Sequence, residues 1–289
     1  MADFSDWVGR EQRSADRLDE ALAARWLATL DLTAPETPAM PQGVHFVLCT
    51  PQAPTAMLGV DGHPARSDDP AGIYPPVDLP RPHAAGSEIE FLKPLSLGDR
   101  IDRLSRVVSF EEKEGRSGRL AFLKLDHAIT ANGEPAIRET QTLVYREASA
   151  ADAPLTPPEV GESLFDPTAW DRVRAIAPSE ALLFRFSALT FNTHRIHYDA
   201  PYAREVERYR GPVVHGPLIA TLLLRLAADV VGENRVRKFG FSARSPAIVG
   251  DKLHLALRRT GETLEMAALN DAGTVLTQAH AMVDEGSSG

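Results

Sequence analysis

Residues 192–199 gather the side chains of this chain that are best suited to move a proton. The stretch, NTHRIHYD, holds His194 and His197 together with Asn192 and Asp199, between apolar flanks. A histidine titrates near neutrality, so it can accept or release a proton at physiological pH, and a neighbouring amide or carboxylate can orient its ring. The cluster predicts an acid–base site.

A second motif follows closely, GPVVHGPLIATLLLRLAADVV, in which His215 and Gly216 open a strongly apolar run. Glycine lets a substrate carbonyl approach the backbone, and the unpaired N–H groups at a helix N-terminus can stabilise an enolate oxygen. Paired with the polar cluster, this motif predicts a site that handles thioesters. Pro217 near the first turn and Gly232 after the last one are typical boundary residues of a helix.

A metal site is a weaker alternative. His197 and Asp199 form the H-x-D half of a two-histidine, one-carboxylate iron site, for which His254 is a conceivable third ligand. His194 and His197 have the i, i+3 spacing of a chelating pair, but no second cluster in the sequence supplies the remaining ligands. We therefore expect no metal.

Purely structural roles are the other alternative. Asn192, His194 and Asp199 have the residue types of turns and caps at the end of a strand. His215 could satisfy backbone groups at the start of the following helix. Residue types alone do not separate these roles from chemistry.

An internal repeat organises the elements that must position these side chains. The pattern P-x-x-x-G-D-x-[IL] occurs at residues 94–101 and again at 246–253, each time ahead of alternating segments separated by glycine-containing turns. Such alternation indicates antiparallel meanders, and a repeat of this length indicates a duplicated domain. The predicted parts are an N-terminal unit on the acyl-group side (1–150), a linker (151–163), a C-terminal unit with the polar cluster (164–285) and a disordered tail (286–289).

Each unit also has helical signals. Residues 14–30 begin with Ser14 as a cap, followed by early acids and apolar residues at helical spacing. The run after Pro217 is apolar nearly all round, so its helix should be enclosed by sheet. The first unit should lack an equally long central helix because Pro51 and Pro54 interrupt it, which leaves room for an acyl group. The prediction is an α+β double hot-dog fold, in which two antiparallel sheets each wrap a helix and the second helix is longer and more buried.

Composition narrows the classes of partner and compartment. The 289 residues carry a formal net charge of −9, which argues against nucleic acid or an anionic membrane as a partner. The one cysteine, Cys49, excludes an intramolecular disulfide and fits a reducing compartment. The first residues show no signal-peptide pattern, and charged residues interrupt the longest apolar run, so we expect a cytoplasmic protein.

The motifs resemble those of a known enzyme family. FSALTFNTHRIHYDAPYA followed by GPVVHGPLIATLLL resembles the MaoC-like double-hot-dog hydratases, in the branch that contains mesaconyl-C4-CoA hydratase, itaconyl-CoA hydratase and mitochondrial hydroxyacyl-thioester dehydratase type 2. PQAPTAMLGVDGHP, PRPHAAGSEIEF and PLSLGDRI resemble the same branch, so the likeness covers nearly the whole chain. It implies reversible addition of water across the 2,3 double bond of an enoyl thioester of coenzyme A or an acyl carrier, with no metal and no redox cofactor.

The resemblance also implies roles for individual residues. The broader family carries its catalytic pair as D-x-N-P-x-H; here the histidine falls on His197 and the aspartate on Asn192, which cannot ionise. His197 is thereby implied as the principal acid and base, Asn192 as a holder of water or of the substrate carbonyl, and the Gly216 amide as the donor to the thioester oxygen. Supporting candidates for orienting or sharing the proton are Asp199, His194 and His215.

Substrate recognition points to basic residues. Mesaconyl and itaconyl groups carry a free carboxylate, which the planar fork of an arginine binds with two hydrogen bonds. The candidates for this carboxylate are Arg195, Arg81 and Arg66. The phosphates of the coenzyme would suit the densest basic stretch, RVRKFGFSAR, through Arg237, Lys238 and Arg244.

Two other functions would use the same features. A hot-dog thioesterase would polarise its thioester at the same helix N-terminus, but it needs a carboxylate to attack or to activate water, which Asp199 could supply. A non-catalytic acyl-thioester-binding protein would bind without turnover, and the pairing of His197 with Gly216 argues against it. A homodimer is left open by the sequence.

Overall fold

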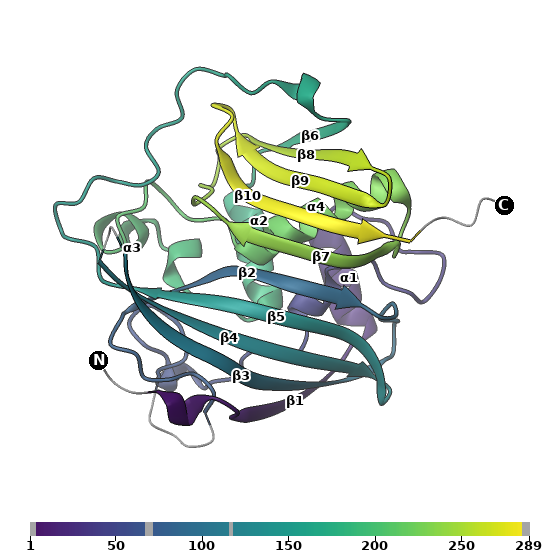
Figure 1. Ribbon diagram of the computed structural model, residues 1–289, viewed down its shortest axis with the longest axis horizontal. Coiled ribbons are helices and arrows are strands. Elements are labelled where there is room, and N and C mark those ends of the chain that lie inside the picture. Colours follow the sequence, from purple (N-terminus) through teal and green to yellow (C-terminus); the bar gives the residue numbers. More distant parts are fainter. Residues whose placement is uncertain (1–3, 67–71, 116–117, 285–289) are drawn as a thin grey trace.

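A ten-stranded antiparallel sheet covers the helices of the computed structural model, which describes residues 4–66, 72–115 and 118–284 (Figure 1). The strand order is β1-β3-β4-β5-β2-β7-β10-β9-β8-β6. The strands are β1 (Glu11–Arg17), β2 (Arg81–Phe91), β3 (Arg100–Gly115), β4 (Gly118–Ala131), β5 (Glu134–Arg146), β6 (Arg172–Ile176), β7 (Val236–Ala243), β8 (Leu253–Thr260), β9 (Thr263–Asn270) and β10 (Val275–Val283). The α-helices are α1 (Glu20–Thr29), α2 (Glu180–Thr190), α3 (Ala200–Glu205) and α4 (Gly216–Val231), and the 3-10 turns are η1 (Ser5–Trp7), η2 (Val44–Val47), η3 (Thr55–Met57), η4 (Pro167–Ala169) and η5 (Arg195–His197).

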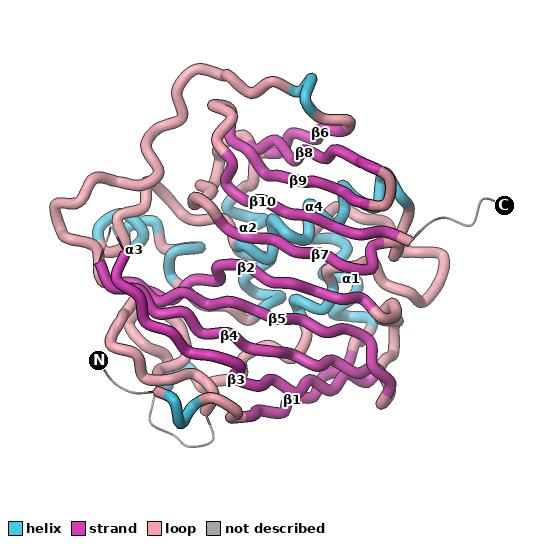
Figure 2. The backbone as a smooth tube through the Cα atoms, in the orientation of Figure 1, coloured by secondary structure: helices cyan, strands magenta, loops and turns pink. Residues whose placement is uncertain are grey.

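The two halves of the chain build equivalent halves of this sheet. In each half a short strand and a helix precede four longer strands: β1, α1 and β2 to β5, then β6, α2 and β7 to β10. The halves join where β2 pairs with β7, from Gly86↔Ser242 to Glu90↔Lys238. The two predicted sheets are therefore continuous, and α1, α2 and α4 lie on one face of the combined sheet (Figure 2). The division at residues 151–163 stays a prediction, and the predicted tail lies outside the described residues.

The predicted meanders are confirmed. β3, β4 and β5 pair in succession, as do β8, β9 and β10. The turn that opens each meander has the same glycine, Gly98 with φ 90° and Gly250 with φ 82°, in the left-handed region that only glycine adopts without strain. The repeated Gly-Asp motif is thus a repeated turn.

The first predicted helix is partly wrong and another was missed. Residues 14–17 belong to β1, because pairing with β3 outweighs their helical propensity, and α1 begins only after Asp19 caps it by accepting from the Leu22 N–H. The missed helix is α2, capped in the same way by Ser179. Residues 18–32 and 178–192 show the same succession of buried and exposed positions. α1 and α2 are therefore copies of one element.

The core is thickest under α4. Leu218, Leu223 and Leu226 have no exposed surface, and burying one such side chain contributes about 1.5–3 kcal/mol. The corresponding place in the N-terminal half holds only η2, followed by Cys49 with φ 53°. A second helix that is longer and more buried is thus confirmed. Within the part of the chain that the structure describes, no helix is long and apolar enough to cross a membrane.

Candidate active site

The polar cluster of residues 192–199 follows a helix and not a strand, so the alternative of turn and cap residues at the end of a strand is wrong about that element. α2 ends at Phe191, whose left-handed φ of 48° turns the chain back, and the Asn192 N–H bonds the Ser187 carbonyl at 2.9 Å. The Asn192 Oδ1 then accepts from the His194 N–H at 2.9 Å. This Asx turn leads into η5 and leaves the NH₂ group of Asn192 as the part that can face a ligand.

His197 is held as a base. Its side chain is buried, and its Nδ1 lies 2.7 Å from the Val213 carbonyl oxygen. A carbonyl only accepts, so Nδ1 carries the hydrogen and Nε2 of the neutral ring presents a lone pair. Burial lowers the pKa of His197 to about 4, so the ring is neutral at pH 7. The geometry therefore fixes both the tautomer and the protonation state that a general base requires.

His215 and Gly216 lie directly against this base. The His215 ring stacks on His197 with centroids 3.7 Å apart, and its Nε2 is 2.8 Å from the Ser187 hydroxyl. Gly216 is the first residue of α4, where backbone N–H groups lack intrahelical partners. A Cβ at Gly216 would lie 4.0 Å from the Ala84 carbonyl of β2, so a side chain here would fill the space beside that strand.

A loop from the N-terminal half lies against the cluster, and no role was predicted for it. The Arg195 N–H bonds the Asp61 carbonyl at 2.9 Å, and the Thr193 hydroxyl bonds the Gly62 carbonyl at 2.5 Å. Gly62 has φ 87° and lies so close to the Thr193 carbonyl that no side chain fits. The loop therefore depends on its glycine to approach the cluster.

This loop adds another histidine to the site, His63, which is paired with the carboxylate of Asp61. Asp61 Oδ2 lies 3.1 Å from His63 Nδ1, and the His63 ring is 4.1 Å from the His194 ring. His194 is buried 5.5 Å from His197 in turn, and burial, with His63 and His197 nearby, lowers its pKa to about 2. In the sequence, the VDGHP motif was part of the family resemblance, but it indicated no role for Asp61 or His63.

Buried polar groups surround His194 as well. Glu207, which the sequence did not single out, is 2% exposed and lies 3.9 Å from His194 Nε2. It forms an ion pair with Arg81, so the charge inside the protein is compensated. Tyr209 bonds His83 Nε2 through its hydroxyl at 2.7 Å, next to the same cluster. No local pattern marks these residues, because they meet only through the fold.

The Asp199 and His254 side chains of the H-x-D metal hypothesis have partners within the protein. Asp199 Oδ1 accepts from the Tyr202 N–H at 3.0 Å and so caps α3, while Oδ2 accepts from Arg195 at 2.7 Å. His254 bonds Asp271 at 2.6 Å. A different group has ligand-like spacing: the ligand atoms of Asp61, His63 and His194 lie within 4.8 Å of one another.

The arginines predicted for a substrate carboxylate are already bound by the protein. Arg195 pairs with Asp199, and Arg81 pairs with Glu207. Arg66 donates to two backbone carbonyls, at 3.0 and 2.9 Å. The basic stretch is exposed on β7 and just beyond it, where Arg237 pairs with Asp284 and Arg244 bonds Gln278. A phosphate-binding role for Arg237, Lys238 and Arg244 stays a prediction.

Comparison with known proteins agrees with this geometry. The family model for hydroxyacyl-thioester dehydratase type 2 matches residues 43–249. The chain is 38% identical over 283 residues to the mesaconyl-C4-CoA hydratase of Chloroflexus aurantiacus, covering 96% of each protein. Among solved structures it is similar to HtdX of Mycobacterium tuberculosis, with a TM-score of 0.68 at 15% identity over 95% of this chain and 100% of that one. A second protein of Mycobacterium tuberculosis, described as having a double hot-dog fold, gives a TM-score of 0.54 at 15% identity over 95% of this chain and 96% of that one.

The predicted double hot-dog fold and the predicted family are both confirmed. The family match covers most of the chain, and the identity of 38% extends over nearly its full length. The chain belongs to the hydroxyacyl-thioester dehydratase type 2 family and is a hydro-lyase that acts on acyl thioesters.

Proposed function

We propose that this protein reversibly hydrates the 2,3 double bond of an enoyl-CoA whose acyl group is a short dicarboxylic acid, of the mesaconyl-C4-CoA type. The 38% identity to a mesaconyl-C4-CoA hydratase over nearly the full chain supports the acyl group. The buried Cys49 is the one cysteine and remains a free thiol, which fits the reducing cytoplasm in which we expect the reaction.

The Gly216 amide is assigned to the thioester oxygen. Water adding to C3 pushes negative charge onto this oxygen as an enolate forms. An N–H group at the start of α4, reinforced by the helix dipole, stabilises such charge. The absence of a Cβ at Gly216 leaves the thioester room beside Ala84.

His197 is assigned to the reacting water. Its Nε2 lone pair accepts a proton from water as the oxygen bonds to C3, and in the dehydration direction the protonated ring returns that proton to the leaving hydroxyl. The observation that carries the proposal is the 2.7 Å bond from Nδ1 to Val213, because it directs the lone pair to Nε2 beside the start of α4.

The Asp61–His63 pair is assigned the part of the aspartate that this chain lacks. Asn192 cannot ionise, but a carboxylate-oriented histidine lies across His194 from His197. The His63 side chain is 32% exposed, so it lies between the cluster and solvent. We assign to His63 the proton that C2 of the substrate receives. Asp61 orients its ring.

The test is hydration of mesaconyl-C4-CoA by the purified protein, followed as loss of the conjugated enoyl-thioester absorbance and, in parallel, as release of free thiol. We expect the absorbance to fall without thiol release. Thiol release at the same rate would instead identify a thioesterase. Asp199 is a poor nucleophile for that reaction because Tyr202 and Arg195 hold both of its oxygens. Binding of the thioester without either signal would identify a non-catalytic binding protein.

A further inference from the structure

Two loops bring three potential metal ligands together beside the base. Asp61 and His63 lie on the loop from the N-terminal half, and His194 lies in the polar cluster, where its ring is 5.5 Å from that of His197. The ligand atoms of Asp61, His63 and His194 lie within 4.8 Å of one another. In the described portion of the chain this is the one group of three such ligands. The spacing allows one ion to contact all three after small side-chain movements.

Hydrogen bonds tie the two loops together on both sides of His194. The Thr193 hydroxyl donates to the Gly62 carbonyl at 2.5 Å. The Arg195 N–H donates to the Asp61 carbonyl at 2.9 Å. His194 is thereby held against the loop that carries the other two ligands before any ion binds, and such preorganisation lowers the cost of binding.

Asp61 and His63 are spaced like two ligands of one zinc ion. Asp61 Oδ1 accepts from the His63 backbone N–H at 3.0 Å, and Oδ2 then faces the ring, 3.1 Å from His63 Nδ1. In a tetrahedral site with bonds of about 2.0–2.1 Å, two ligand atoms lie about 3.3 Å apart. A zinc ion can therefore take the place of the hydrogen between Oδ2 and Nδ1 with little movement of either side chain.

His194 adds a nitrogen that the protein leaves without a partner. Its side chain is 3% exposed, and its Nε2 is buried with no hydrogen bond to any described residue. The ring lies 4.1 Å from the His63 ring. A buried polar atom without a partner costs free energy, and a neutral imidazole nitrogen is a good metal ligand. An ion held by the three side chains would supply the missing partner.

The donor set and the access route favour zinc among the common divalent ions. Two imidazoles and one carboxylate suit Zn²⁺, which takes four ligands, whereas Mg²⁺ and Ca²⁺ take six or more, mostly oxygen atoms. Three protein ligands leave one position for water. The side chains of His63 and Asp61 are 32% and 14% exposed, so an ion can reach the group from solvent on this side.

We propose that Asp61, His63 and His194 bind Zn²⁺ and that the bound ion reversibly inhibits hydration; the inhibition, though not the site, rests on the proposed function. As the bond from zinc to His63 Nδ1 forms, the proton of that nitrogen passes to solvent. The N–H that remains on a zinc-bound imidazole is a much weaker acid than an imidazolium. The ring can then no longer give a proton to C2 of the substrate, and removal of the ion restores it.

The site is tested by calorimetric titration of ZnCl₂ into the full-length protein, after dialysis against EDTA and removal of the chelator. We expect the wild type to bind one equivalent. Asp61→Asn and His194→Gln each remove a ligand and should weaken binding by about 100-fold or more. Asp61→Asn, at the more exposed ligand, decides the result if His194→Gln folds poorly. Absent binding, or equal binding in Asp61→Asn and wild type, would overturn the site.

A second histidine–carboxylate pair provides the matched control. Asp271 lies 2.6 Å from His254 Nε2, but in the described chain this pair belongs to no group of three ligands. Asp271→Asn should therefore bind zinc as the wild type does. A loss of zinc binding in Asp271→Asn equal to that in Asp61→Asn would place the ion elsewhere and overturn the site.

The inhibition is tested by adding ZnCl₂ to the hydration of mesaconyl-C4-CoA. We expect the rate to fall by about 10²-fold or more as the site fills, since a positioned acid contributes that much, and EDTA to restore it. Zinc bound at the site with an unchanged rate would overturn the inhibition. A wild-type protein that binds zinc but hydrates no thioester would support the site and refute the proposed function instead.

Discussion

The two helix starts of the duplicated scaffold share their backbone pairing but differ in the side chains that the site uses. The Met40 N–H bonds the Leu95 carbonyl as the Val214 N–H bonds the Ala247 carbonyl, both at 2.8 Å. This pairing aligns Pro41 with His215 and Gln42 with Gly216. The matching ends of α1 and α2 likewise align residues that differ in polarity. These further pairs are Leu27 with Ser187 and Leu32 with Asn192.

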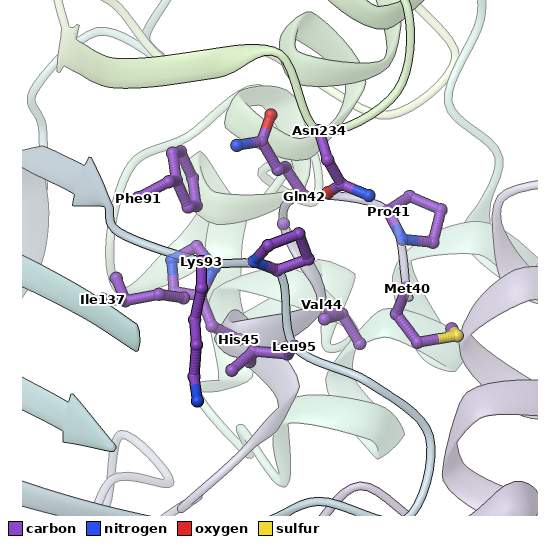
Figure 3. A pocket seen from close by; sticks show the side chains of 12 residues that line it. Met40, Pro41, Gln42, Val44, His45, Phe91, Lys93, Leu95, Ile137 and Asn234 are labelled. Carbon is purple, nitrogen blue, oxygen red and sulfur yellow. The ribbon is translucent and has the colours of Figure 1, made fainter. Parts of the chain in front are cut away.

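The pair Gln42 and Gly216 separates the reactive C-terminal half from the N-terminal half. At the position equivalent to Gly216, Gln42 carries a side chain whose amide donates to the Val236 carbonyl at 2.6 Å. The cavity that remains in the N-terminal half, drawn in Figure 3, measures about 10 Å³, the size of one water molecule. Lining it, His45 is buried with neither ring nitrogen hydrogen-bonded among the described residues. The N-terminal copy therefore has a buried histidine and a glutamine side chain where the C-terminal copy has Gly216.

The two halves also differ in what lies on the inner face of the sheet. The C-terminal half retains α4 and with it the helix N-terminus that the chemistry needs. The N-terminal half has only η2 and Cys49 in that place, and its inner face carries Ser105, His127 and Glu139 on β3, β4 and β5. The two copies of one fold therefore differ in the element that follows the first helix.

The largest effect should come from the base itself. We expect His197→Ala to lower kcat by about 10²–10⁴-fold, the usual contribution of a positioned acid–base group. KM should change little, because the ring does not hold the thioester. His280→Ala, an exposed histidine on β10, is the matched control and should keep the wild-type rate. Steady-state hydration kinetics with near-wild-type kcat in His197→Ala would refute the assignment.

A reciprocal exchange tests the two helix starts. We expect Gly216→Gln to lower kcat/KM by about 10²-fold or more, because the side chain would occupy the thioester position and bond the Ala84 carbonyl as Gln42 bonds Val236. Gln42→Gly should leave the rate unchanged. Kinetics and melting temperatures of both variants measure this. Equal rates in the two variants would mean that the halves do not differ at this position.

The end of α2 can be changed to the residue of its copy. Leu32 makes the same backbone bond as Asn192, so Asn192→Leu should preserve the end of α2, although it removes the side-chain acceptor for the His194 N–H. We expect it to lower kcat on the order of 10²-fold if the amide contacts the reacting water or the developing charge. Asn192→Asp keeps the acceptor for the His194 N–H, and a rate between those of the leucine variant and the wild type is expected. If Asn192→Leu retains full activity, the amide has only a structural role.

Acid should destabilise both halves to a similar extent. Burial lowers the pKa of His127 and of His197 to about 4, below the usual value of about 6.5. Between these values the unfolded chain binds protons that the folded chain does not, so the free energy of unfolding decreases as the pH falls from about 6.5 towards 4. We expect the melting temperature to fall over this window, and less steeply in His127→Gln and in His197→Gln. A melting temperature that is constant from pH 7 to pH 4.5 would contradict this account.

The smallest expected effect is that of a chelator. We expect dialysis against EDTA to leave the hydration rate unchanged, because the proposed chemistry uses only histidines and a backbone amide. Metal analysis of the purified protein provides the parallel measurement. Loss of activity that a divalent metal restores would indicate a catalytic metal site at Asp61, His63 and His194. In that case Asp61→Asn should abolish metal binding.

Much of the fold followed from local patterns in the sequence. The repeated Gly-Asp turn, the alternating segments and the apolar run from Pro217 predicted both meanders and α4, because turns, strands and buried helices have short-range signatures. The predicted helix over residues 14–30 was partly wrong, because residues 14–17 pair with β3 as part of β1. α2 was missed, and the polar residues that follow it were interpreted as a turn at the end of a strand. Both errors arose where tertiary pairing decides between near-equal local choices.

The sequence by itself determined the chemical type of the site, since His197, Asn192 and Gly216 lie in motifs close together along the chain. Only the tertiary structure brought in the loop with Asp61 and His63 from the other half, because these residues are more than a hundred positions away. It also decided which arginines have partners: Arg195, Arg81 and Arg66, the three candidates for a substrate carboxylate, are bound by the protein itself. Whether a charge is neutralised depends on what lies across from it in space, and a single sequence does not record that.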